Sequence, residues 1–197
     1  MKTLSFFALR FVLVFVLLAS PWQGVRTLTG AAFRLHIRLV ASTLFSRQSI
    51  RVEAFSNPQY PAIDTVVVLP DQPRPGRPGT PAEAKIPFDS LSQGWIPLAM
   101  LTALGLVTPA PWSKRLKLLL AGSLAILTLE SAAIFVSIAF NLTTDATPAW
   151  PRVPLMCANR LLVENIWFSF VPPFLFWAGW LAGSGCWKQL KERLTGR

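Results

Sequence analysis

One ionisable side chain lies inside a long apolar run. Glu130 occurs in Leu129-Glu130-Ser131, near the middle of an apolar stretch that extends from about 116 to 140. A carboxyl group in such a stretch is costly to bury and is a candidate for ligand, proton or partner binding. The alternative is a structural Glu that hydrogen-bonds to another helix, with Ser123 or Ser131 as a local partner. Arg10, inside the first apolar stretch, is a candidate for its charge partner.

A second group that could do chemistry is the thiol of Cys157, because a nearby cation, here Arg160, is typical of thiol nucleophiles. A thiol peptidase or transpeptidase also needs a base, and the only histidine is His36. The fold would have to bring His36 to Cys157, so we predict no catalytic residue and keep this enzyme as an alternative. No cluster with metal-ligand spacing and no nucleotide-binding glycine pattern occurs, so no metal or cofactor is expected.

The last apolar stretch carries the remaining candidate binding residues. Arg160 and Glu164 have the i,i+4 spacing of a helical ion pair near its outer end, where a helix cap is the competing interpretation. Pro172 and Pro173 remove two backbone donors and predict a kink. Interrupted spans can line binding sites, although a kink can also reflect helix packing alone.

Composition indicates whether these residues lie in water or in a lipid bilayer. The chain has 197 residues, of which 52% are hydrophobic and 14% charged, against about 25% charged residues in a typical soluble domain. Four apolar stretches approach the roughly 20 residues needed to cross a bilayer: 4–20, 91–110, 116–140 and 161–182. The sequence therefore predicts an α-helical membrane protein with four transmembrane helices.

Basic residues predict which side of the membrane each loop and terminus faces. The loop 111–117 holds Lys114, Arg115 and Lys117 without an acid, and the tail 188–197 is also basic, so both are placed in the cytoplasm. The N-terminus is then cytoplasmic as well, and residues 22–90 and 141–160 are outside. We therefore expect an uncleaved anchor (1–21), an extracytoplasmic segment (22–90), a helical hairpin (91–140), an outer loop (141–160), a last helix (161–183) and a basic tail (184–197).

The extracytoplasmic segment predicts an amphipathic helix followed by a small β element. Apolar residues at 25, 28, 32, 35 and 39 have helical spacing, although alternation within 33–40 leaves a strand open there. Strands are expected within 49–55, 62–69 and 85–88, and a Pro/Gly loop at 70–81. Because this β element is too small for its own core, we expect it to lean on the membrane surface or a partner. The net charge of +10 fits membrane lipids better than nucleic acid.

Two stretches and the overall layout support a resemblance. IPLAMLTAL at 96–104 and FVPPFLFW at 170–177, with one anchor, an outer segment and three further spans, resemble the exosortase-associated small membrane proteins, of the type that accompanies exosortase H. The resemblance implies a non-enzymatic accessory or assembly protein of a bacterial envelope protein-sorting system, in the inner membrane, with an exosortase as a candidate partner. Exosortases themselves use Cys, Arg and His in that order, whereas the order here is His36, Cys157, Arg160. A small proton-coupled transporter that uses Glu130 is the other alternative.

Overall fold

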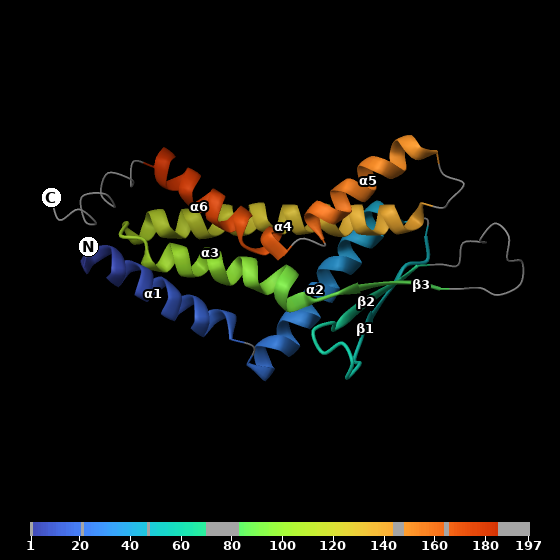
Figure 1. The fold of residues 1–197 in the computed structure, drawn as a ribbon, viewed down its shortest axis with the longest axis horizontal. Helices are drawn as coiled ribbons and strands as arrows, with labels where there is room; N and C mark the ends of the chain where they lie inside the picture. The colour runs from blue at the N-terminus through green and yellow to red at the C-terminus, as the bar shows by residue number, and fades with distance from the viewer. Residues whose placement is uncertain are drawn as a thin grey trace, which may run out of the picture. The chain divides into compact units, whose positions relative to one another are not determined.

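The computed structural model describes residues 2–20, 22–46, 48–69, 83–143, 148–163 and 166–184 (Figure 1). In these ranges the chain is mainly helical and has one three-stranded sheet, as the sequence predicts. The chain divides into two compact units. We call residues 1–21, 95–128 and 169–197 the helical unit, and residues 22–94 and 129–168 the α/β unit.

The helical unit is built from α1 (Lys2–Ala19), α3 (Ile96–Val107), α6 (Val171–Gly183) and residues 112–128 of α4 (Trp112–Leu142). Helix α3 packs against both α1 and α6, as Figure 1 shows. Apolar side chains from these helices form its core, chiefly Leu101, Leu104, Leu118, Ile126, Trp177 and Leu181.

A glycine on α4 allows close packing in this unit. A Cβ atom at Gly122 would lie 2.6 Å from Cδ2 of Leu101 on α3 and 3.0 Å from Cδ1 of Phe176 on α6. Both distances are shorter than ordinary van der Waals contact, so only glycine fits without a shift of its neighbours. Small residues at helix contacts are typical of membrane helix bundles.

The expected basic loop at 111–117 is mostly the first turns of α4, and two of its basic residues cap helix ends in the helical unit. The Arg115 side chain donates to the backbone oxygens of Ala110, at 2.8 Å, and Leu106, at 2.9 Å. Lys114 Nζ donates to the backbone oxygen of Ser184, at 3.2 Å. Cations at these positions neutralise carbonyl groups at the C-terminal ends of α3 and α6.

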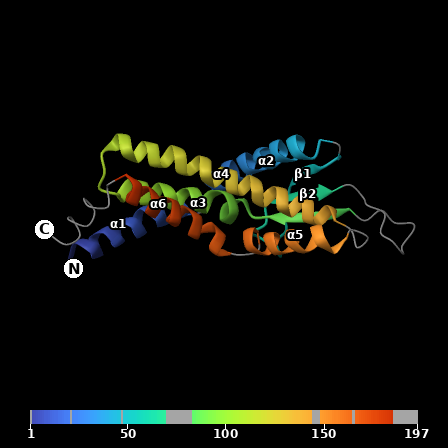
Figure 2. The same ribbon diagram turned by 90° about the horizontal axis from the view of Figure 1, so that it is seen from above.

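The α/β unit joins α2 (Gln23–Leu44) to an antiparallel sheet of β1 (Arg51–Ala54), β2 (Thr65–Leu69) and β3 (Ala84–Phe88), in the order β1-β2-β3. The three predicted strands are confirmed, and the open choice at 33–40 is resolved as helix. Figure 2 shows α2 beside the sheet. One buried core combines α2, the sheet and residues 129–142 of α4: Phe33, Ile37, Val52, Val67, Leu69, Ile86, Phe88, Ile134 and Ile138.

This core corrects one expectation. The sequence predicts a β element that must lean on the membrane surface or a partner, whereas α2 and residues 129–142 of α4 supply its core. The predicted third span, 116–140, lies within α4, and its residues Ile134 and Ile138 contribute to this core. An apolar pattern fits a lipid-facing helix and a core helix alike, so the sequence alone does not separate the two.

Arginines of α2 bind the sheet region. Arg26 donates to the backbone oxygen of Pro61, Arg34 to that of Asp64 at 3.5 Å, and Arg38 to that of Val52 at 3.1 Å. The basic face of α2 is therefore used, at least in part, to hold the protein's own backbone carbonyls.

The fourth predicted span differs from the structure. Residues 149–162 form a separate helix, α5 (Ala149–Leu162), and a short 3-10 turn (Ile166–Ser169) precedes α6. Pro172 and Pro173 do not kink a helix that is already under way; they lie in the first turn of α6. Proline is tolerated there because its missing N–H would have no partner inside the helix. The expected outer loop at 141–160 is thus largely helical.

Several expectations fall outside the described residues, among them the Pro/Gly loop at 70–81, Glu164 and most of the basic tail.

By length and composition, only α4 among the described helices could by itself cross a membrane. The total rises to three if the bent pairs α1–α2 and α5–α6 each count as one span.

Replacing Gly122 with Leu should destabilise the helical unit by about 1–3 kcal/mol, because the new side chain overpacks the contact with Leu101 and Phe176. Gly179→Leu on α6 is the matched control, since nothing lies within 4 Å of a Cβ atom there. Thermal unfolding of the full chain in detergent measures both variants. Equal melting temperatures for the two variants would contradict this packing.

Candidate functional site

The candidate site centres on Glu130, which α4 places against α2. Glu130 is only 5% exposed. Its Oε2 atom lies 3.7 Å from Nδ1 of His36. The other ring nitrogen of His36, Nε2, lies 2.8 Å from the hydroxyl oxygen of Ser131. Two neighbouring residues of α4 thus face the two edges of one imidazole ring.

The positions of these residues on α2 and α4 explain why His36 lies beside Glu130 and Ser131. His36 lies beside the buried face of α2 that carries Phe33 and Ile37. Glu130 and Ile134 are one turn apart on α4, and Ile134 packs in the same core as Ile37. Packing of the two apolar faces therefore brings His36 to Glu130 and Ser131.

Burial lowers the pKa of His36 below its ordinary value, because a charged imidazolium loses hydration in this position. The neutral ring has one nitrogen that donates and one that accepts a hydrogen bond. It can therefore hydrogen-bond to the Ser131 hydroxyl while its other edge faces the carboxyl group.

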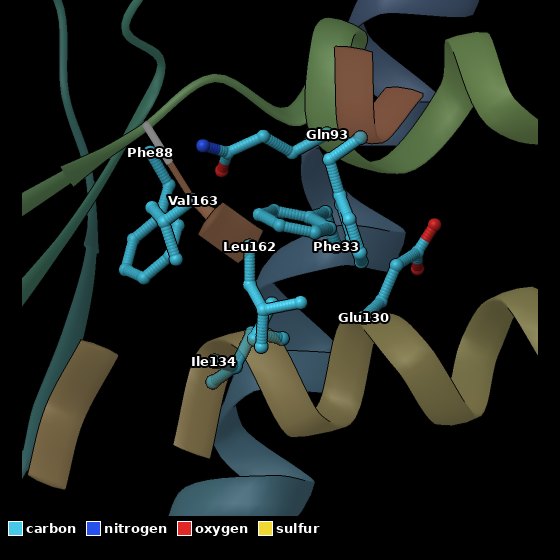
Figure 3. Close-up of a pocket in the computed structure, with 9 residues that line it drawn as sticks. Phe33, Phe88, Gln93, Glu130, Ile134, Leu162 and Val163 are labelled. Atoms are coloured by element: carbon cyan, nitrogen blue, oxygen red, sulfur yellow. The ribbon is translucent and has the colours of Figure 1, made fainter. Parts of the chain in front are cut away.

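The second carboxyl oxygen, Oε1, is buried and has no hydrogen-bond partner among the residues that the structure describes. Glu130 also lines a small pocket of about 20 Å³, whose other walls are mainly apolar. Figure 3 shows Glu130 rising from α4 on one side of this pocket, with the Gln93 amide on the opposite side near Phe88.

The order Ser131, His36, Glu130 is that of a nucleophile, a base and an orienting acid, but its setting is poorly suited to catalysis. Ser131 lies in the interior of α4, where the neighbouring backbone N–H groups donate within the helix. Those groups cannot stabilise an oxyanion at the same time. The 3.7 Å separation of His36 from Glu130 is also longer than a hydrogen bond.

The structure does not gather the other predicted residues at Glu130. The Arg10 guanidinium lies over the Phe6 ring of the helical unit, 4.2 Å from its centroid. Cys157 and Arg160 are exposed on α5, whereas both ring nitrogens of His36 face α4. The structure thus does not assemble the proposed Cys157–His36 thiol site. Pro172 and Pro173 lie in the first turn of α6 in the helical unit, and Glu164, the expected partner of Arg160, is outside the described residues.

Sequence reasoning found Glu130 and named Ser131 but missed His36 as the partner of both. Ser131 and His36 are 95 positions apart, and no motif links them. The available signal was that a lone histidine and a lone buried carboxyl group each needed a polar partner.

Compared with protein-family models, with curated proteins and with solved structures, the chain matches none.

A double-mutant cycle should detect the contact between His36 and Glu130. We expect His36→Ala and Glu130→Ala to couple by about 0.5–3 kcal/mol in unfolding free energy, as neighbours in a buried polar network do. The exposed pair Arg51 and Glu53, 3.8 Å apart, is the control and should couple by about 0–1 kcal/mol. Strictly additive effects at His36 and Glu130 would show that the contact contributes no stability.

Proposed function

We propose that this chain is a non-enzymatic integral membrane protein that serves as an accessory or assembly partner in a bacterial envelope protein-sorting system. In this proposal the four apolar stretches 4–20, 91–110, 116–140 and 161–182 cross the inner membrane, both termini are cytoplasmic, and residues 22–90 are on the outer side. The resemblance to exosortase-associated proteins makes an exosortase the candidate partner.

The observation that carries the membrane part is the apolar outer surface of the helical unit. Helices α1, α4 and α6 expose large aliphatic and aromatic side chains, and Leu124 is 67% exposed. Water-soluble monomers rarely expose so large an apolar patch, whereas lipid tails cover such side chains at no cost. The outward-facing set includes Leu9, Leu13, Val16, Leu17, Leu116, Leu120, Leu124, Phe174 and Leu175.

The exposed face of α2 supports a place at the membrane surface. Leu28, Leu35 and Leu39 lie on one side of the helix, opposite the buried side, and Leu28 is 72% exposed. Only three residues separate α1 from α2, and one of them is the exposed Trp22. If α1 ends at the outer interface, α2 begins there, with tryptophan at the headgroup level.

The exposed face of α5 supports the partner role. Trp150, Val153 and Leu161 follow helical spacing on one side of α5, and Trp150 is 80% exposed. A row of apolar residues at i, i+3 and i+11 is the pattern by which a helix packs against another helix. We assign this α5 stripe to the partner protein, as a surface that association would remove from water.

The setting of Glu130 favours binding over catalysis. Its neighbour Ser131 lies within a continuous helix, and the carboxyl group is closed off in an apolar core. Such a group is better suited to hold a ligand or fix a helix contact than to turn over a substrate.

The partner role is tested by site-specific photo-crosslinking in the native bacterial membrane. A benzophenone amino acid at Val153 should capture one membrane protein, whereas the same group at the exposed Tyr60 should not. Val153→Asp should then reduce copurification of that protein in mild detergent, and Tyr60→Asp should leave it unchanged.

A chain that runs as a monodisperse monomer and yields no adduct from Val153 would overturn the partner role. An adduct formed equally well from Tyr60 would show that capture is not specific to α5.

A further inference from the structure

The side of α2 that points away from the sheet is an apolar surface of the α/β unit. Leu28, Leu35 and Leu39 are 72%, 57% and 58% exposed. Ala31 and Ala32 lie between them and are exposed as well. The spacing of these five residues places them on one side of the helix. We call them the outward face of α2.

The outward face carries no charge, although α2 is a basic helix. Arg26, Arg34 and Arg38 lie beside or opposite this face and donate to backbone carbonyls of the sheet region. An amphipathic helix that binds anionic lipids uses the basic residues of its polar face to reach the headgroups. In α2 those basic residues hold the protein's own fold instead.

The hydroxyl groups near the outward face are bonded within the helix. The Thr27 hydroxyl donates to the backbone oxygen of Gln23, at 3.0 Å. The Ser42 and Thr43 hydroxyls donate to the backbone oxygen of Leu39, at 3.1 and 2.7 Å. A hydroxyl group bonded in this way keeps its hydrogen bond when water is removed, so this side of α2 can lie against lipid.

The position of α2 in the chain favours lipid over a second protein as the cover of this face. Helix α2 begins at Gln23, three residues after α1 ends at Ala19. Trp22, in this short connection, is 62% exposed and belongs to the residue types that prefer the headgroup level. The α5 stripe differs, because the exposed cation Arg160 lies next to it.

We propose that α2 lies along the outer surface of the inner membrane, with its outward face among the acyl chains, and that it needs no anionic headgroup to stay there. This inference rests on the proposed membrane location of α1. It adds the face by which the α/β unit docks and the class of lipid, which is any phospholipid with fluid acyl chains. An apolar helix face in such a position is buried by roughly 5–10 Å.

The test places nitroxide labels on the full chain in nanodiscs of pure phosphatidylcholine, with Cys157 and Cys186 replaced by Ser. The accessibility of a label at Leu35 to oxygen and to a water-soluble nickel complex is measured. Oxygen concentrates in hydrocarbon, whereas the nickel complex stays in water. We expect the ratio of oxygen access to nickel access to be severalfold higher at Leu35 than at the control position.

Tyr60 is the matched control position. Its side chain is 57% exposed, as is that of Leu35, and both residues belong to the α/β unit. Tyr60 precedes Pro61, whose backbone oxygen accepts from Arg26 on the sheet side of α2. A label at Tyr60 should therefore remain in water.

The claim about headgroups is tested by adding phosphatidylglycerol to the nanodiscs and by raising the salt concentration. Salt screens the attraction of cations to anionic lipids but does not weaken the burial of apolar surface. The label at Leu35 should give the same ratio under all of these conditions. A high ratio found only with phosphatidylglycerol, or only at low salt, would overturn the proposal.

Two further results would also overturn it. A label at Leu35 that is as open to nickel as the label at Tyr60 would place the outward face in water. A label shielded from both oxygen and nickel would show that protein, here a second copy of the chain, covers the face. Leu39 provides a second label position on the same face if the label at Leu35 disturbs folding.

Labels at Leu120 and Leu124 on α4 separate this proposal from the proposed function. If these two labels lie in hydrocarbon while the label at Leu35 lies in water, the docking of α2 is wrong and the membrane location stands. If all three labels lie in water, the membrane location is wrong and the docking of α2 fails with it.

Discussion

The helical unit is constrained by one feature: many of its apolar side chains face outward. Fully burying one leucine side chain is worth about 1.5–3 kcal/mol, and α1, α4 and α6 leave many such side chains on the surface. In water this surface would drive aggregation. In lipid it carries no penalty, but the hydrophobic effect then no longer holds the helices together. In the membrane setting that we propose, close packing must do so, and the close approach of Gly122 to Leu101 and Phe176 fits this requirement.

The lipid solvent that we propose for the helical unit also requires polar groups to be satisfied within the protein. Trp177 donates to the hydroxyl oxygen of Thr108, at 2.8 Å, and that hydroxyl donates to the backbone oxygen of Leu104, at 2.6 Å. Trp95 donates to the backbone oxygen of Leu18, also at 2.8 Å. These bonds link α3 to α6 and to the end of α1, so the polar contacts also fix the arrangement of the helices.

The α/β unit has a packed core of its own. Its sheet pairs Val52 with Val67 and Val67 with Ile86, and α2 covers the strands. Asp64 supports the chain entering β2: its carboxylate accepts from the Ser90 backbone N–H at 3.2 Å and from the Thr65 hydroxyl at 3.1 Å. A Cβ atom at Gly30 would lie 3.0 Å from Oδ2 of Asp64, so glycine lets α2 approach this cluster.

The sequence predicted the local elements well, because local spacing encodes them. The alternation around Val52 and the β-branched run at Val66 and Val67 predicted the strands, and the leucine spacing predicted α2. The sequence did not predict the features that depend on tertiary packing. Ile134 is apolar whether it meets lipid or a core, and Pro172 is equally compatible with a kink and with a helix start.

The sequence predicted only part of the candidate site, because the rest also depends on tertiary packing. A carboxyl group within an apolar run was visible at Glu130, whereas its contact with His36 exists only because α2 and α4 pack together. Arg10 was the wrong partner to expect, since it lies over Phe6 on its own helix.

Lipid as the solvent of the helical unit is tested most directly by nitroxide labels on α4 in lipid nanodiscs, with Cys157 and Cys186 replaced by Ser. The accessibility of each label to oxygen and to a water-soluble nickel complex is compared. The account predicts that labels at Leu120 and Leu124 are reached by oxygen and shielded from nickel, as in hydrocarbon. Labels at those two positions that are readily reached by the nickel complex would contradict it.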